Sequence, residues 1–285
     1  MESNFRAPRI TVHKHPEYHA KQSPVLPTSL VQTPYRQTLL GASGQGKTVF
    51  LQSWIMDLMP QHDRYYIISH SIHQDPMWDP VKAFIEKKLK AQKVNPAKVD
   101  PPLYYDSYDR AALQKIIDTQ SEMVKLAKRQ GYKQMPSICV ILDDMLDDKR
   151  LMTSTGSETK LLNQLYIRGR HDFISVVTSV QRFSPLNNIA KSQFTAYVCY
   201  RLRSQSDLDS LCEELSGVYP GGKKTIEAIY RKAIEDQPYS FLFCNLMART
   251  PADTFWLRFE KRLVPRELTE DSHEGPPERD HLSRA

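Results

Sequence analysis

The chain has 285 residues, with 39 Lys and Arg against 33 Asp and Glu, and a formal charge of +6 at pH 7. At roughly 100–200 residues per domain, this length allows one large domain or two small ones. The hydrophobic fraction of 40% supports a buried core. No apolar run approaches the roughly 18 residues of a membrane-spanning helix, so we expect no membrane-spanning segment.

The N-terminus and the cysteines favour an intracellular protein. The first 20 residues contain no apolar stretch of the kind that a secretory signal needs. The four cysteines include no CxxC pair, so we expect buried, reduced thiols and neither zinc ligands nor disulfides. They are Cys139, Cys199, Cys212 and Cys244.

Both ends of the chain differ in composition from its middle. Residues 1–35 are rich in proline and show neither helical nor strand periodicity, which predicts an extended, poorly packed N-terminal arm. Residues 263–285 have almost no apolar content, which predicts a disordered acidic tail. The last 20 residues carry six acidic and three basic side chains, so the rest of the chain is mildly basic. Such a charge is compatible with nucleic acid without requiring it.

Between these ends, apolar segments alternate with amphipathic ones. The expected strands are 37–42, 64–70, 137–144, 173–181, 195–202 and 239–246. The expected helices are 48–59, 81–90, 109–130, 160–170, 207–217 and 223–236. Nearly continuous hydrophobicity is typical of strands that are covered on both faces. The alternation therefore predicts an α/β fold with a mostly parallel sheet and helices on both of its faces.

The segment after the first strand matches GxxxxGK[ST] and leads into a helix. Glycines in such a loop let backbone N–H groups surround phosphates at a helix N-terminus. We expect Lys47 to reach the β- and γ-phosphates and Thr48 to supply a hydroxyl to Mg²⁺. The predicted nucleotide-binding residues are Gly41, Ala42, Ser43, Gly44, Gln45, Gly46, Lys47 and Thr48.

A second motif is an apolar strand that ends in two carboxylates, Asp143 and Asp144. This is the form of a Walker B motif, and the carboxyl edge of the sheet would bring Asp143 beside Thr48 and Mg²⁺. Asp144 would then polarise the attacking water as a base. A further strand, 64–70, separates the two motifs in the sequence, which suits ATPases with an additional strand between the Walker A and Walker B strands. The GTPase motifs DxxG and NKxD are absent, whereas a small-molecule kinase stays an alternative.

Polar residues near the fourth strand complete the candidate site. That strand ends at Gln181, whose amide is a candidate contact for the γ-phosphate or the attacking water. Arg168 and Arg170 end the preceding helix, where they either cap its dipole or act as an arginine finger on a neighbour's ATP. Arg201 and Arg203 compete for the finger role.

Other polar segments are less specific. Ser69, His70, Ser71 and His73 follow the second strand and are interpreted as edge residues that sense nucleotide. The Lys-rich segment 87–102 is either a solvated surface or a DNA contact. The Ser/Thr-rich segment 146–160 is a candidate mobile loop.

Together, the motifs GASGQGKT, YYIISHS, VILDDM and RGRHDFISVVTSVQ resemble those of virion DNA-packaging ATPases in the FtsK–HerA superfamily, from poxviruses, other large eukaryotic DNA viruses and virophages. The resemblance runs from about Thr38 to Cys244. It implies a RecA-like P-loop core, here assigned to 36–262, which hydrolyses ATP with Mg²⁺. It also implies a homo-oligomeric ring, commonly a hexamer, that translocates double-stranded DNA without sequence specificity into a preformed capsid. A capsid or portal-vertex protein would be its partner. The expected location is the viral factory or the host cytoplasm or nucleus, including association with the virion.

The resemblance assigns the same roles to individual residues. Lys47 and Thr48 would bind ATP–Mg²⁺, and Asp143 would assist the metal. Asp144 would be the base, although many ATPases with an inserted strand have Glu there, one methylene longer. Two other functions fit the same motifs: an ATPase that remodels protein partners, and a non-catalytic, nucleotide-dependent scaffold. The remaining catalytic residues under this resemblance are the sensor Gln181 and the trans finger, Arg168 or Arg170.

Overall fold

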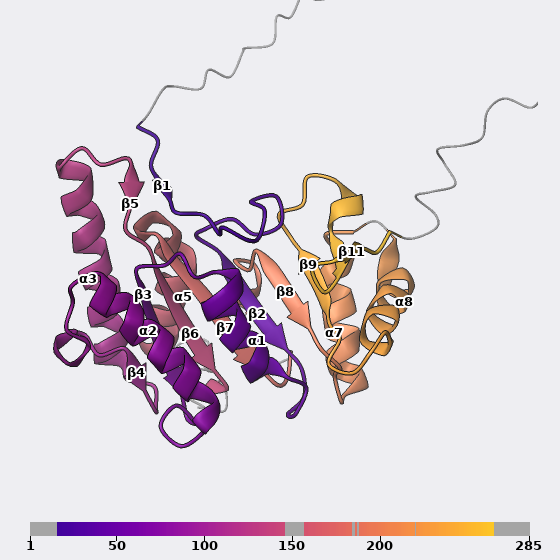
Figure 1. Ribbon diagram of the computed structural model, residues 1–285. Coiled ribbons are helices and arrows are strands. Elements are labelled where there is room, and N and C mark those ends of the chain that lie inside the picture. Colours follow the sequence, from indigo (N-terminus) through magenta and orange to yellow (C-terminus); the bar gives the residue numbers. More distant parts are fainter. Residues whose placement is uncertain (1–15, 146–156, 184–185, 187, 220, 265–285) are drawn as a thin grey trace, which may run out of the picture.

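The computed structural model describes residues 16–145, 157–183, 186, 188–219 and 221–264. Within them, a nine-stranded sheet has the order β11-β10-β9-β8-β2-β7-β6-β3-β4 (Figure 1). The strands from β8 to β4 in this order are parallel, and β9, β10 and β11 each pair antiparallel with their neighbours. The predicted mostly parallel α/β fold is therefore confirmed. The bounds are β2 Arg36–Leu40, β3 Arg64–Ser69, β4 Tyr104–Tyr105, β6 Ile138–Asp143, β7 Ile174–Val180, β8 Ala196–Cys199, β9 Leu242–Asn245, β10 Phe255–Leu257 and β11 Lys261–Arg262.

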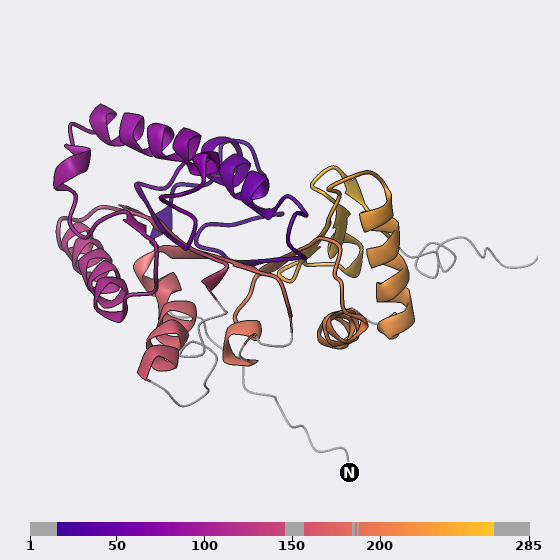
Figure 2. The ribbon, with the colours of Figure 1, turned by 90° about the horizontal axis from the view of Figure 1, so that it is seen from below.

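Helices cover both faces of this sheet, as its buried strands require. Figure 2 shows α1 and α2 on one face and α3, α5, α6 and α7 on the other. A π-helical segment, Trp54–Leu58, continues α1 directly. The helices are α1 Lys47–Ser53, α2 Asp79–Ala91, α3 Arg110–Arg129, α5 Ser157–Arg168, α6 Asn188–Lys191, α7 Gln205–Ser216 and α8 Gly222–Glu235. Short 3-10 segments are Pro76–Trp78, Pro96–Lys98, Gly169–Asp172 and Pro251–Asp253.

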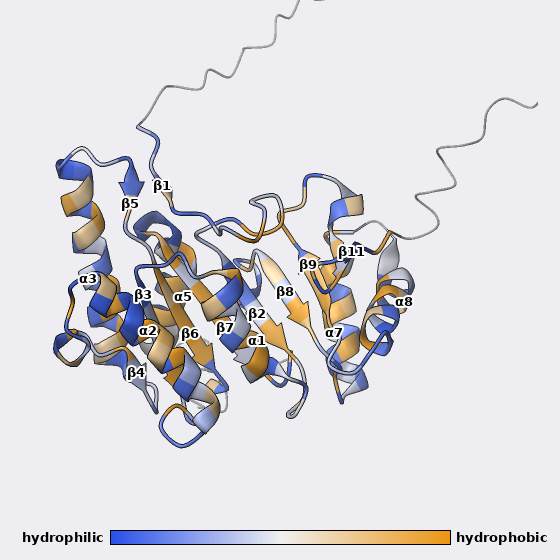
Figure 3. Ribbon diagram, in the orientation of Figure 1, coloured by the Kyte–Doolittle hydropathy of each residue, from blue (hydrophilic) through white to orange (hydrophobic). Residues whose placement is uncertain are grey.

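The core is centred on the strands that were predicted from their apolar runs. Every residue of β2, β6, β7, β8 and β9 is buried, and Figure 3 shows hydrophobic residues concentrated in β6, β8 and β9. All four cysteines are buried free thiols. Among the described residues, no helix is long and apolar enough to cross a membrane.

The order of the strands identifies the additional strand between the two nucleotide motifs. The phosphate loop follows β2, the acid pair lies at the end of β6, and β7 pairs in parallel with both of these strands. The strand 64–70, which separates the motifs in the sequence, is β3 and lies on the far side of β6. The predicted additional strand is therefore present, and it is the strand that ends next to Gln181.

The described part of the N-terminal arm, 16–35, is better packed than its sequence predicts. Leu26, Leu30 and Val31 are buried against the main core. A short strand, β1 (His19–Ala20), pairs with β5 (Gln134–Met135) in a separate two-stranded sheet. This proline-rich segment shows no helical or strand periodicity, so the sequence pattern does not predict these contacts. Residues 1–15, 146–156 and 265–285 lie outside the described residues, so the division into arm, ATPase domain and acidic tail stays a prediction.

A buried polar cluster ties α1 to the sheet. The Tyr35 hydroxyl accepts a hydrogen bond from Trp54 Nε1 at 3.0 Å and lies 3.1 Å from His62 Nε2. The other ring nitrogen of His62, Nδ1, lies 3.3 Å from the Ser137 hydroxyl. Burial, with a smaller contribution from the charge of Lys88, lowers the pKa of His62 to about 3, so the ring is neutral. The cluster fixes the helix that begins at the phosphate loop.

Candidate active site

The phosphate loop joins β2 to α1, and its glycines have identifiable structural reasons. Gly44 and Gly46 have φ angles of 77° and 89°, in the left-handed region that side chains other than glycine rarely adopt. Gly41 has a different constraint, because a Cβ there would lie 2.6 Å from Cβ of Tyr200. The loop can therefore adopt this path only with glycine at these positions.

Lys47 is buried inside the loop, with 8% of its surface exposed. Its Nζ donates hydrogen bonds to the carbonyl oxygens of Gly41 at 2.7 Å and Ala42 at 3.0 Å. Burial lowers the pKa of Lys47, while the nearby carboxylates of Asp144 and Asp143 act in the opposite direction. The ammonium group is thus held between the loop and the acid pair, where phosphates would bind.

Asp143, the last residue of β6, is buried and held by hydroxyl groups. Ser69 Oγ, at the end of β3, donates a hydrogen bond to Asp143 Oδ2 at 3.0 Å. Ser69 Oγ also lies 3.2 Å from Ser71 Oγ, which accepts a hydrogen bond from Trp78 Nε1. Burial raises the pKa of Asp143, and the neighbouring hydroxyls of Ser179 and Ser69 partly offset this effect. The sequence placed Ser69 and Ser71 at this edge but missed that they position Asp143.

Asp144 and Gln181 are brought together at the ends of β6 and β7. Gln181 Nε2 donates a hydrogen bond to Asp144 Oδ2 at 2.7 Å. Asp144 has a φ of 55°, and its backbone N–H donates to the carbonyl oxygen of Ser179 at 3.1 Å. A non-glycine residue in the left-handed region is strained, and such residues cluster at functional sites. The strained turn directs the second carboxylate towards the glutamine amide.

The residues at this edge fit a magnesium ion bound together with nucleotide phosphates. Thr48 and Asp143 line the same cavity and offer a hydroxyl and a carboxylate, the hard oxygen donors that Mg²⁺ prefers. Within the described residues, no group of three or more His, Cys, Asp or Glu side chains is placed to hold a metal. A cation here would therefore take most of its remaining oxygens from phosphates and water.

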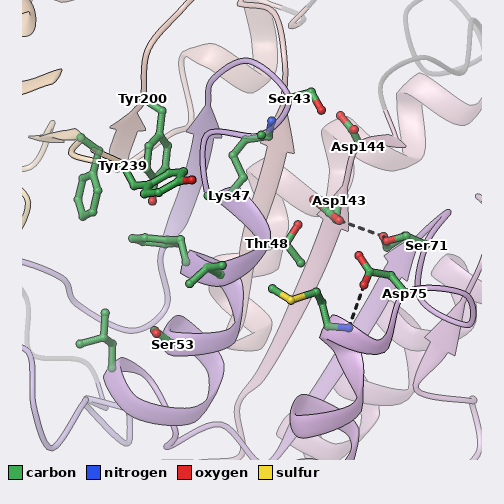
Figure 4. Close-up of a pocket in the computed structure, with 18 of the residues that line it drawn as sticks. Ser43, Lys47, Thr48, Ser53, Ser71, Asp75, Asp143, Asp144, Tyr200 and Tyr239 are labelled. Carbon is green, nitrogen blue, oxygen red and sulfur yellow. Dashed lines mark hydrogen bonds between the residues drawn. The ribbon is translucent and has the colours of Figure 1, made fainter. Parts of the chain in front are cut away.

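The cavity that contains these groups has a volume of about 1010 Å³. This lies at the upper end of the range for small-molecule sites and accommodates a nucleoside triphosphate. Figure 4 shows Tyr200 and Tyr239 on the side of Lys47 away from Asp143. The sequence did not identify the aromatic lining residues, which are Phe50, Tyr200, Tyr239, Phe241 and Phe259.

The four candidate arginines lie at opposite edges of the sheet. Arg168 and Arg170 are exposed and precede β7, whereas the phosphate loop follows the parallel strand β2. The seven residues of β7 separate the two edges by roughly 20 Å. Burial lowers the pKa of Arg36, the first residue of β2, and the charge of Arg170 adds to this effect, which places Arg170 near the amino edge. Neither arginine reaches the phosphate loop of its own chain.

Arg201 and Arg203, by contrast, follow β8 at the carboxyl edge. Ala42 N–H donates a hydrogen bond to the carbonyl oxygen of Arg201 at 3.1 Å, which links this segment to the phosphate loop. Both side chains are exposed. Sequence spacing alone did not separate these two arginines from Arg168 and Arg170, whereas the strand order does.

The Lys-rich segment 87–102 begins in the last part of α2 and continues beyond it. Lys88 Nζ donates a hydrogen bond to the carbonyl oxygen of Pro60 and lies 5.8 Å from the centre of the Tyr65 ring. Lys90 pairs with Glu86 at 3.5 Å. Two of its lysines therefore make contacts within the chain.

A phosphate loop, a buried carboxylate, a second carboxylate and a glutamine, all at the carboxyl edge of one parallel sheet, define a P-loop ATPase. The chain also belongs to a defined family. The family model described as "Poxvirus A32 protein" matches residues 25–231, which is most of the chain, and the chain is a member of that family. No curated protein sequence matches it.

Several solved structures are similar to this chain at low sequence identity. One is "EssC (ATPases 2 and 3) from Geobacillus thermodenitrificans", with 14% identity, a TM-score of 0.51 and coverage of 92% of this chain and 50% of that chain. Another is B204, the DNA-packaging ATPase from Sulfolobus turreted icosahedral virus, with 15% identity, a TM-score of 0.49 and coverage of 79% and 97%. The pCW3 conjugation coupling protein TcpA has 18% identity, a TM-score of 0.47 and coverage of 85% and 66%.

Proposed function

We propose that this chain is an ATP-hydrolysing motor that moves double-stranded DNA into a preformed capsid. The observation that carries the proposal is the joint placement of Lys47, Asp143, Asp144 and Gln181 at one sheet edge, in a chain of the poxvirus A32 protein family. The motifs that place these residues there are also those that resemble virion DNA-packaging ATPases.

The chain's own residues account for the steps of hydrolysis. The loop N–H groups and Lys47 would bind the β- and γ-phosphates. Gln181 would orient the attacking water. Asp144, whose Oδ2 accepts a hydrogen bond from the Gln181 amide, would take the proton of that water. Thr48 and Asp143 would hold Mg²⁺, which supplies neutralisation of phosphate charge when it is bound.

The distance between the two edges supports the proposed trans role of Arg168 or Arg170. An exposed arginine at the amino edge can contribute only to another subunit's nucleotide, so each site would be completed by a neighbour in a homo-oligomeric ring. We propose a hexamer. An arginine finger raises turnover by 10³–10⁵-fold in well-studied cases.

DNA would pass through this ring without sequence-specific contacts. Contacts between Lys or Arg and phosphates carry no base information, so they permit sliding. A mildly basic subunit, repeated around a channel, supplies enough such contacts. The capsid or portal-vertex protein would be the docking partner, in the viral factory or the host cytoplasm or nucleus and on the virion.

The test is ATP turnover measured with and without double-stranded DNA, with oligomer size recorded in parallel. DNA should stimulate turnover under conditions in which the chain assembles. Equal rates with and without DNA would contradict the motor and favour an ATPase that acts on protein partners. The absence of any turnover would favour a scaffold.

Two variants test the assignments within this experiment. Lys47→Ala should abolish turnover, and persistent hydrolysis would refute the phosphate-loop assignment. Arg170→Ala and Asp144→Ala subunits should each be inactive alone. Mixed rings should recover partial activity, because an Arg170→Ala subunit with an intact Asp144 can then receive Arg170 from a neighbouring Asp144→Ala subunit. No recovery in these mixtures or in matched Arg168→Ala mixtures would refute action in trans.

A further inference from the structure

The cavity extends beyond the phosphate loop to an end that phosphates would not use. Val49, in the first turn of α1, lines the cavity with 52% of its surface exposed. Tyr239, which lies between α8 and β9, lines it with 68% exposed. Large apolar surfaces left open beside a buried cation indicate a ligand with both an anionic and a flat apolar part.

Tyr239 lies directly against the phosphate loop. Its ring atom Cδ1 is 3.4 Å from the position that a Cβ on Gly46 would occupy. A Cβ at position 46 would thus be in van der Waals contact with this ring, while the φ of 89° is what requires glycine there. If the phosphates of a nucleotide lie in the loop, the attached ribose and base would extend out of the loop next to Tyr239.

The backbone of Tyr239 is held in an unfavourable conformation. Its φ is 62°, in the left-handed region that bulky side chains rarely adopt. Arg258, on the facing turn, also has a positive φ, 53°. Its guanidinium bonds Asp236 at 3.0 Å and Glu260 at 2.8 Å, and its N–H donates to the carbonyl oxygen of Phe241. Two strained turns are therefore braced against each other, and this bracing holds an aromatic ring open to solvent.

We infer that Tyr239 is the stacking platform for the base of the nucleotide, with Val49 contacting the base from the helix side. This inference rests on the proposed nucleotide site and adds the adenine end to it. The charged side chains at this end, Arg258 and Glu260, are bonded to each other. The base is thus held by stacking and apolar contact more than by hydrogen bonds at its edge, so guanine is accepted as well as adenine.

The test compares equilibrium binding of ATP, GTP and inorganic tripolyphosphate, each with Mg²⁺, by calorimetry. Tripolyphosphate shares the phosphates and lacks the base. The wild-type chain should bind ATP and GTP more tightly than tripolyphosphate. Tyr239→Ala should weaken the binding of ATP and GTP by about tenfold, in line with the loss of one base–aromatic stack, and should leave the affinity for tripolyphosphate unchanged. Tyr239→Phe should bind like wild type, as should the control Tyr132→Ala, an exposed tyrosine on the α3–β5 connection.

Tyr239→Gly separates binding from folding. Glycine relieves the strained φ, so the melting temperature should rise while ATP affinity falls. Unchanged ATP affinity in Tyr239→Ala, or equal weakening of ATP and tripolyphosphate, would overturn the inference. Because the experiment measures nucleotide binding, the stacking role of Tyr239 is tested independently of whether DNA stimulates turnover. Loss of binding of all three ligands in Lys47→Ala checks the phosphate end separately.

Discussion

The buried His62 makes the stability of the fold depend on pH. In the unfolded chain its pKa is near 6.5, whereas in the folded chain burial lowers it to about 3. Because the folded pKa is lowered, the unfolded state takes up the proton first, and stability is lost as the pH falls from 6.5 towards 3. Between pH 7.5 and pH 5.0, this one residue should cost about 2 kcal/mol of unfolding free energy.

Urea denaturation at pH 7.5 and pH 5.0 measures this loss, with His62→Gln as the test variant and His19→Gln, at an exposed histidine, as its control. His62→Gln should be less stable than wild type at pH 7.5, because its contacts with Tyr35 and Ser137 change. Its loss between the two pH values should be smaller than that of wild type by about 2 kcal/mol. His19→Gln should keep the full wild-type loss. An equal loss in wild type and His62→Gln would refute the argument from burial.

Three further predictions concern the site. Gly41→Ala should destabilise the fold by about 1–3 kcal/mol and weaken nucleotide binding, because its Cβ would clash with Tyr200. Gly44→Ala, which has open space around it but a positive φ, should cost only about 1 kcal/mol of unfolding free energy. If urea denaturation shows Gly44→Ala to be the more destabilising change, the geometry is contradicted. Asp143→Asn should raise the melting temperature, because burial already disfavours the charged carboxylate of Asp143. The same change should abolish Mg²⁺-dependent turnover. A lower melting temperature would contradict the argument from burial. Gln181→Ala should reduce turnover at least tenfold with unchanged ATP affinity, whereas wild-type turnover would exclude Gln181 from the chemistry.

The strands and helices that carry strong periodicity were predictable from the sequence, and the pairing of short elements was not. The runs that became β6 and β7 are mostly apolar, and every residue in them is buried, because both faces of the sheet are covered. The two-residue strands β4 and β11 leave no such pattern. The strand predicted at 239–246 begins only at Leu242, because Tyr239 takes a left-handed conformation that no local composition indicates.

Within the site, local motifs were readable, whereas contacts across the fold were not. The phosphate loop and the acid pair are each contained in a few consecutive residues, so their spacing alone predicts their chemistry. The bond from Ser69 to Asp143 depends on β3 pairing with β6 in register. The approach of Tyr239 to Gly46 joins residues almost two hundred positions apart. An exposed tyrosine before a strand has no feature in the sequence that marks it as a ligand contact.

The placement of Arg168 and Arg170 at one edge of the sheet and the phosphate loop at the other has a consequence for assembly. A contact that joins these two edges is heterologous, since each subunit offers a different surface to each of its two neighbours. Such a contact either closes into a ring or continues as a helical filament. An open row of subunits would always leave its last nucleotide site without an arginine. Closure would then supply the missing group, so the subunits would reach full activity only once the ring had formed.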